Sequence, residues 1–143
     1  AFPSLCDFRF TNMERCKMID SKFNSCDMSF STLENSIFRE SNFLNVNFYC
    51  SNLTNVDFTE VKIKKCSFHG IRVGRADWLS YVANVAHSVD DEFIDQYRLV
   101  EVSEVISEKS EANKSFIVLH KDSSSNVKDI LSQKNIYANG NGL

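Results

Sequence analysis

The sequence predicts a repeat fold in which the chain turns once every five residues, followed by a smaller segment without repeats. From Cys6 to Gly70 the chain divides without insertion into thirteen blocks of five, and the third residue of every block is large and apolar. A period of five fits neither an α-helix with 3.6 residues per turn nor a simple alternating strand. The thirteen central residues are Phe8, Met13, Met18, Phe23, Met28, Leu33, Phe38, Phe43, Phe48, Leu53, Phe58, Ile63 and Phe68.

The first two positions of the block are also restricted. The first residue is always Cys, Ser, Thr or Val, and the second is mostly Asp, Asn or Lys. One turn per block would point the first and third residues inward and the other three outward. Short internal repeats of this kind build solenoids, in which each unit buries its apolar face against its neighbours.

This pattern resembles that of the pentapeptide-repeat family, whose usual block is a small residue, Asp or Asn, Leu or Phe, and two variable positions. The likeness covers about residues 6–75. It implies a mainly β fold, a right-handed square β-helix (solenoid) with four blocks per coil, so that residues twenty apart stack about 4.8 Å apart. This sequence departs from the family pattern with Cys and Val at the small position and a predominance of Phe and Met at the centre, which predicts a fuller interior.

The chain therefore divides into two expected parts. We predict a pentapeptide-repeat β-helix over residues 1–77, with its regular blocks over 6–70, and a small α+β or helical cap over residues 78–143. Apolar residues recur at helical spacing over residues 78–89, and Asp77 stands where an N-cap would be. We expect this helix to cover the last coil, whose unpaired edge would otherwise invite aggregation.

The remainder of the cap is less regular. Residues 90–106 suit either a helix or a strand, and residues 115–121 predict a strand. Residues 122–133 predict a short helix capped by the three serines near its start. The polar stretch at 107–115 predicts a loop, and residues 137–143 predict a flexible tail.

Five cysteines are present, and three of them, Cys6, Cys26 and Cys66, fall in one column of small residues. Stacked cysteines can form a disulfide, but buried reduced thiols are the favoured interpretation. The spacing matches neither a disulfide framework nor a zinc site. We therefore expect a reducing compartment, the cytoplasm or a host cytosol. The Phe-centred, Cys-bearing repeats are also similar to the luminal domain of synaptic-vesicle glycoproteins, which keeps an extracellular alternative open.

An outward apolar column provides the first candidate site. Phe10, Phe30 and Cys50 occupy the fifth position of their blocks, with Tyr49 beside them, although the repeat requires no apolar residue there. Such a row indicates a contact surface, either for a partner protein or for the second half of the chain. Scattered exposed Phe is the ordinary alternative. We predict partner binding at Phe10, Phe30, Tyr49 and Cys50.

An acidic column provides an alternative site. Asp20, Glu40 and Glu60 stack in it with Asp57 nearby, and like charges at ladder spacing repel. Some pentapeptide-repeat proteins resemble duplex DNA and protect type II topoisomerases such as gyrase, and this likeness would make the acids a phosphate imitation. Residues 1–77, however, carry ten Lys and Arg against nine Asp and Glu. A solvated face is the ordinary interpretation.

Sequence patterns of catalysis are weak. His87 precedes Asp90 and Asp91 without a further His or Cys at ligand spacing, which favours a charge cluster over a metal site. Neither a nucleophile elbow nor a phosphate-binding glycine loop is present. We expect no enzyme activity, metal or cofactor. An enzyme built on the second half would require a concave polar pocket between the coils and residues 90–143.

These observations predict a non-catalytic protein–protein interaction module, with a part in a bacterial secreted effector left open. The alternative is a DNA-mimicking modulator of gyrase. A net charge of −3 argues against direct nucleic-acid binding. The longest apolar runs, such as residues 116–119, are far too short to span a membrane. We expect a protein partner, and the C-terminal segment is a candidate homodimer contact.

Overall fold

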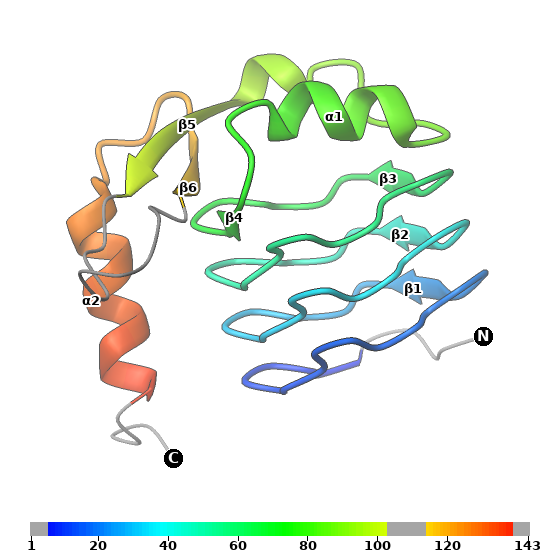
Figure 1. The fold of residues 1–143 in the computed structure, drawn as a ribbon, viewed down its shortest axis with the longest axis horizontal. Coiled ribbons are helices and arrows are strands. Elements are labelled where there is room, and N and C mark those ends of the chain that lie inside the picture. The colour runs from blue at the N-terminus through cyan, green and yellow to red at the C-terminus, as the bar shows by residue number, and fades with distance from the viewer. Residues whose placement is uncertain (1–5, 103–113, 139–143) are drawn as a thin grey trace.

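Stacked coils make up the first half of the protein. The computed structural model describes residues 6–102 and 114–138. Three short strands, β1 (Lys22–Asn24), β2 (Asn42–Leu44) and β3 (Lys62–Lys64), form a parallel sheet along one side of the column. Their partners are twenty residues apart, as in the pairing of Phe23 with Phe43. Figure 1 shows the coils lying one above another.

Isolated bridges with the same offset form the other sides of the column. Asp7 pairs with Asp27, Asn12 with Thr32, and Lys17 with Ile37, all in parallel. Together with the β1–β2–β3 sheet, these bridges show that twenty residues complete one coil and that each block of five forms one side. The predicted β-helix, with four blocks per coil, is confirmed over this region.

Side-chain hydrogen bonds explain the Asp and Asn at the second position of the block. Their side-chain oxygens accept the backbone N–H two residues ahead, at 2.9 Å from Ser29 to Asp27 and 3.0 Å from Thr54 to Asn52. This local turn is one that Asp and Asn form readily. It bends the chain out of one side of the coil and towards the next corner.

The corners themselves are tight turns. The N–H of Ser36 donates to the carbonyl of Leu33 at 3.1 Å, and Asn35 between them has φ of 63°. A positive φ at the third residue alone is what a type II turn requires. Twelve non-glycine residues at the fifth position have φ between 55° and 63°, and Gly70 continues the series at 80°. The fifth position is therefore defined by backbone conformation rather than by side-chain type.

Buried serines at the first position are satisfied by the neighbouring coil. The hydroxyl of Ser31 donates to the carbonyl of Phe8 at 2.7 Å, and that of Ser36 donates to Met13 at the same distance. Among the described side chains, no buried nitrogen or oxygen is without a hydrogen-bond partner. A small hydroxyl is therefore tolerated inside the solenoid because it donates to a corner carbonyl of the neighbouring coil.

Aromatic rings fill the interior. Phe23 stacks on Phe43 with ring centroids 5.0 Å apart, and Phe48 stacks on Phe68 at 5.1 Å. The central residues from Met18 onward are buried, whereas Phe8 and Met13 in the first coil are only half-buried. The predicted inward columns are confirmed, and each added coil covers the apolar layer of the one before it.

Helix α1 (Trp78–Val85) covers the C-terminal end of the solenoid (Figure 1). Within the described residues, Asp77 stands at the predicted N-cap position, but its carboxylate accepts hydrogen bonds from Arg75 at 2.8 and 2.9 Å instead of capping the helix. The helix also ends before the predicted residue 89. Ser88 is extended and forms a parallel bridge with Lys62, so the chain adds a further ladder step at this point.

The end of α1 and the segment that follows it bind the N–H groups that the last coil presents at the C-terminal end of the solenoid. The N–H of Glu60 donates to Val85 O at 2.8 Å, that of Ile63 to Ser88 O at 3.0 Å, and that of Lys65 to the Asp90 carboxylate at 2.9 Å. A further N–H, of Phe68, donates to the Tyr97 hydroxyl at 3.2 Å. The predicted capping of the open coil is therefore carried by backbone and side-chain acceptors as well as by helix α1.

A small antiparallel sheet completes the cap. After the short 3₁₀ helix η1 (Ile94–Gln96), strand β5 (Tyr97–Val102) pairs with β6 (Ser115–His120), which in turn pairs with β4 (Arg72–Val73) of the solenoid. The strand predicted at 115–121 is confirmed, and the ambiguous stretch divides into η1 and β5. Most of the loop predicted at 107–115 lies outside the described residues.

Helix α2 (Val127–Ala138) runs along the flank of the stacked coils (Figure 1). It begins later than predicted, because Asn126 rather than a serine caps it. The Asn126 side chain accepts the N–H of Asp129 at 2.9 Å, and the Asp129 carboxylate accepts the N–H of Asn126 at 3.3 Å, a reciprocal capping box. The helix continues into the predicted tail, whose last five residues lie outside the described part. Over residues 6–102 and 114–138, no helix has the length and apolar character needed to cross a membrane.

Candidate functional site

The outward apolar column forms a row of rings that we call the aromatic ridge, consisting of Phe10, Phe30 and Tyr49. The rings of Phe10 and Phe30 stack with centroids 5.2 Å apart and an interplanar angle of 6°. Tyr49 meets Phe30 edge-on at 5.5 Å. Phe10 is 37% exposed, while Phe30 and Tyr49 are half-buried. Phe10 and Phe30 stack because the left-handed corners of successive coils place fifth-position side chains one above another, and Tyr49 precedes the next corner, at Cys50.

The upper part of the ridge contacts the C-terminal unit, by which we mean β5, β6 and α2. Cys50, the fourth residue of the predicted site, is only 2% exposed and packs with Ile117, Leu119 and Ile130. Phe30 and Tyr49 pack against the same cluster, and the Tyr49 hydroxyl donates to the Gln133 side chain. The structure thus places Cys50 beneath the C-terminal unit, and the accessible part of the site is Phe10 with the outer edges of Phe30 and Tyr49.

A second row of rings, the histidine stack, joins the solenoid to the C-terminal unit. It consists of Tyr49, His69, His120 and Tyr97. Centroid distances along it are 5.9, 4.9 and 5.0 Å, with interplanar angles of 6°, 13° and 19°. The Nδ1 atom of His69 accepts the backbone N–H of His120 at 2.9 Å, so this His69 ring is neutral with its proton on Nε2.

Electrostatics favour the same neutral form. Partial burial lowers the pKa of His69 below its ordinary value, and repulsion from His120 and Arg98 lowers it further. Sequence analysis did not find this site, because His69 and His120 are 51 residues apart. The available signal was weak: His69 occupies the outward fourth position directly beyond Tyr49 in the same column, where a ring would extend the ridge.

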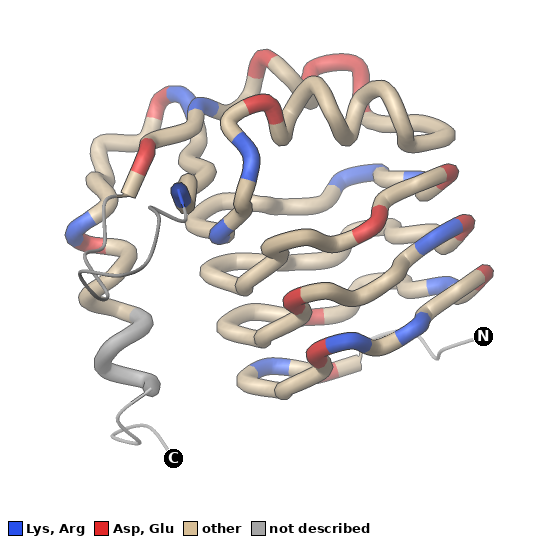
Figure 2. Tube along the Cα trace, in the orientation of Figure 1, with Lys and Arg blue, Asp and Glu red and all other residues tan. Residues whose placement is uncertain are grey.

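The acidic row, Asp20, Glu40 and Glu60, lies at another corner of the coils. All three side chains are exposed. Asp57 beside them accepts a hydrogen bond from Arg39 at 2.7 Å, and Glu60 Oε2 lies 3.4 Å from Nδ1 of His87. Figure 2 shows basic segments interspersed with the acidic ones on this side of the solenoid. The surface therefore has mixed charge around the row.

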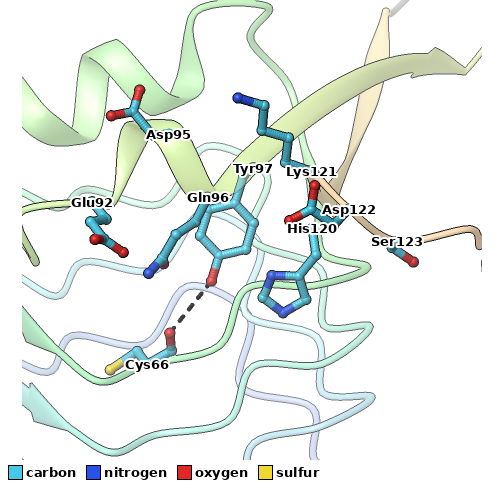
Figure 3. A pocket seen from close by; sticks show the side chains of 9 residues that line it. All are labelled: Cys66, Glu92, Asp95, Gln96, Tyr97, His120, Lys121, Asp122 and Ser123. Carbon is cyan, nitrogen blue, oxygen red and sulfur yellow. Dashed lines mark hydrogen bonds between the residues drawn. The ribbon is translucent and has the colours of Figure 1, made fainter.

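An open cavity of about 800 Å³ lies between the last coil and the cap, where an enzyme built on the second half would need a pocket. Figure 3 shows its lining. The Tyr97 hydroxyl is oriented into the last coil, where it donates to the carbonyl of Cys66 at 3.5 Å and accepts the N–H of Phe68. The lining residues are Cys66, Glu92, Asp95, Gln96, Tyr97, His120, Lys121, Asp122 and Ser123.

The nucleophile and base that this cavity offers are engaged in structural contacts. Burial raises the pKa of the Cys66 thiol to about 11, and the thiol donates to the carbonyls of Phe43 and Lys64 at 3.4 and 3.5 Å. The ring of His120 lies between those of His69 and Tyr97. A thiol with so high a pKa is a weak nucleophile at neutral pH. The expectation of no enzyme activity stays a prediction.

His87 and Asp90, which the sequence places in one charge cluster, contact different partners. His87 faces Glu60, while the Asp90 carboxylate accepts the N–H of Lys65. Within residues 6–102 and 114–138, no three His, Cys, Asp or Glu side chains are grouped to hold a metal ion. Burial and the neighbouring Cys26 raise the pKa of the Cys6 thiol. The two thiols lie close together in the predicted small-residue column.

Comparison with known proteins supports the interpretation of the coils. A family model described as pentapeptide repeats matches residues 4–39 and 26–64, with eight copies of the repeat. No curated protein matches the chain. The family match ends at residue 64, so it includes neither His69 nor the cap.

Proposed function

Residues 4–64 are pentapeptide repeats, and from this premise we propose that the chain is a non-catalytic protein-interaction module that binds its partner through the aromatic ridge. In this proposal the solenoid is the right-handed square form that the family resemblance implies. Its interior is occupied by core packing, so recognition falls to the outward corners and faces.

The exposed ring of Phe10 is the observation that carries the proposal. Stacking on Phe30 holds this ring in one orientation, so a partner would lose little side-chain entropy on contact. Charged groups border it: Arg9 forms an ion pair with Asp7 at 2.8 Å and lies 4.0 Å from Asp27. An apolar centre with a charged rim is the usual anatomy of a protein interface. The partner we expect is a protein segment that presents apolar side chains to this ridge.

The wider setting is also proposed. A solenoid that carries a contact ridge suits the targeting part of a bacterial secreted effector, whose partner would lie in a host cytosol. A homodimer formed through the C-terminal segment is the other assembly we consider, and the oligomeric state measured in solution decides between them.

The alternative of a gyrase modulator depends on the acidic row. Its support is the stacking of Asp20, Glu40 and Glu60 on one corner. The pairing of Asp57 with Arg39 reduces the negative field there. We therefore rank this function second. It predicts that the purified protein alters gyrase supercoiling and that Glu40→Lys abolishes the effect.

The experiment compares Phe10→Ser with Ile19→Ser. Ile19 is also a large exposed apolar residue, at 50%, but it occupies a different side of the coil. Affinity capture with mass spectrometry would identify partners, and sedimentation would report self-association. We expect Phe10→Ser, and more strongly the Phe10→Ser/Phe30→Ser double variant, to lose the partner that wild type and Ile19→Ser retain. Unchanged partners and oligomeric state in both Phe10 variants would refute the site. Capture of gyrase that survives these substitutions would favour the acidic row.

A further inference from the structure

We propose that the histidine stack is a pH-sensitive latch, which holds the C-terminal unit against the solenoid near neutral pH and releases it in mildly acidic solution, uncovering Phe30, Tyr49 and Cys50. This inference goes beyond the function proposed above and can be tested without a partner protein.

The latch sits at the junction between strand β6 and the last coil. Beside the antiparallel pairing of β6 with β4, the backbone hydrogen bonds here include Gly70 N–H to Val118 O at 2.6 Å and Val118 N–H to Ile71 O at 3.0 Å. The bond from the His120 N–H to His69 Nδ1 is the next in this series. It is the member of the series whose acceptor is a titratable side chain.

Protonation of His69 removes this acceptor. A proton on Nδ1 would make the ring a donor facing the backbone N–H of His120, so the hydrogen bond would be replaced by a repulsive contact. Stacking then adds a second cost, because the imidazole of His120 lies only 4.9 Å away, centroid to centroid, and opposes a positive charge on His69.

The surroundings do not offer His69 a compensating anion within the stack. Its two neighbouring rings are Tyr49 and His120, and beyond His120 lies Tyr97. Helix α2 contributes the neutral Gln133, bound to Tyr49. The carboxylates line the cavity on the His120 side. Among the residues that the structure describes, charged groups from the neighbouring elements include Arg98 of β5, Lys121 and Asp122 after β6, and Glu92 and Asp95 before β5.

The sign of the pH dependence follows from the pKa of His69. Burial, then His120 and Arg98, hold that pKa below the value of about 6.5 that applies when the unit is released. The released form therefore binds more protons in mild acid. The latch is at full strength above pH of about 6.5 and weakens as pH falls from there through the lowered pKa, by up to about tenfold per pH unit for one proton.

Release would uncover the upper ridge because α2 leaves with β6. Ile130 packs in the cluster that buries Cys50, with Val127 and Leu131 beside it. The Ile130 Cδ1 atom also lies 3.4 Å from where a Cβ on Gly70 would be. Separation of β6 from the coil therefore removes the groups that shield the Cys50 thiol.

The test measures hydrogen exchange of the Gly70 and Val118 amides in the full chain at pH 7.5 and pH 5.5, corrected for intrinsic exchange rates. We expect protection to fall about tenfold at the lower pH. Labelling of Cys50 by dithiodipyridine, which reacts with thiols in acid, should rise in parallel when cleavage peptides are resolved by mass spectrometry. Equal corrected protection at the two pH values would overturn the latch.

Two substitutions test whether His69 causes the pH response. His69→Asn keeps an acceptor near the Nδ1 position but does not titrate, so it should stay latched at both pH values. His87→Asn removes an exposed histidine outside the stack and should keep the wild-type response. If His69→Asn fails to fold, an NMR titration of the wild type decides: the pKa of the His69 ring must lie below the ordinary histidine value of about 6.5. A pH response that persists in His69→Asn, or a His69 pKa at or above about 6.5, would refute the proposal.

Discussion

Substitution of Gly70 by alanine should destabilise the junction between the solenoid and helix α2. Gly70 has φ of +80°, and a Cβ placed on it would lie 2.9 Å from the Cys50 Sγ and 3.4 Å from the Ile130 Cδ1. Twelve other fifth-position residues adopt a positive φ while carrying a Cβ, so backbone strain alone does not require glycine here. The requirement comes from the close approach of the Cys50 thiol.

The expected change in the free energy of unfolding follows from two opposing sets of effects. A left-handed alanine costs about 1 kcal/mol, and forcing an extra methyl into this packed site costs about 1–3 kcal/mol. In the opposite direction, alanine reduces the conformational freedom of the unfolded chain, which stabilises the folded state by about 0.4–1 kcal/mol. We therefore expect Gly70→Ala to lower the free energy of unfolding by about 2 kcal/mol, measured by urea denaturation.

A double-mutant cycle identifies the clash as the cause. Cys50→Ala removes the sulfur, so Gly70→Ala should cost about 1–2 kcal/mol less in that background. Gly74→Ala is the matched control: its Cβ would meet only the Thr54 Cγ2 atom, at 3.3 Å, without a positive φ. We expect it to change stability by less than about 1 kcal/mol. A Gly70→Ala variant within about 0.5 kcal/mol of wild type, or strictly additive effects with Cys50→Ala, would contradict this account.

Three further predictions concern the solenoid. Phe48→Ala should lower the free energy of unfolding by about 3–5 kcal/mol in urea denaturation, because the ring is fully buried, stacked on Phe68 and edge-on to Phe43; a loss below about 1 kcal/mol would show that the interior is loosely packed. Ser41→Ala should lower the free energy of unfolding by about 1–2 kcal/mol, since the buried Ser41 hydroxyl binds a corner carbonyl of the preceding coil. Ser41→Thr keeps a hydroxyl but adds a methyl group, so it should still be less stable than wild type if close packing matters as well. Burial raises the pKa of Asp57, but hydrogen bonds from Thr59 and Arg39 outweigh it and leave the pKa below its ordinary value, so this stability is present above the ordinary pKa and lost as pH falls through the lowered one. Arg39→Gln should raise the pKa of Asp57 and shrink the stability lost between pH 6 and pH 3; an unchanged carboxyl titration by NMR would show that Arg39 has no part in it.

The repeat could be predicted from the sequence because its constraints are local. A central residue such as Phe43 is defined by its own block, and its stacking partners follow from the offset of twenty. The Asp and Asn preference is explained by a bond to the residue two positions ahead, which lies within the same block. Each of these features repeats, so one departure does not hide the pattern.

The cap could be predicted only in part because its contacts join distant segments. Strand β6 was predicted, but its pairing with β4 depends on a close packing that no local pattern records. The serines before Asn126 masked the capping box that begins α2. The candidate ridge was located by its period, whereas the burial of Cys50 and the meeting of His69 with His120 depend on where β6 and α2 dock.

The position of α2 along the coils sets a relation between two lengths. Ile130 reaches the level of Gly70, and Gln133 reaches Tyr49, one coil away. Three helical residues advance about 4.5 Å, close to the spacing of about 4.8 Å between adjacent coils. Three to four residues of α2 therefore span the height of one coil. A variant lengthened by one coil of twenty residues would need only three to four more residues in α2 to keep the same coverage.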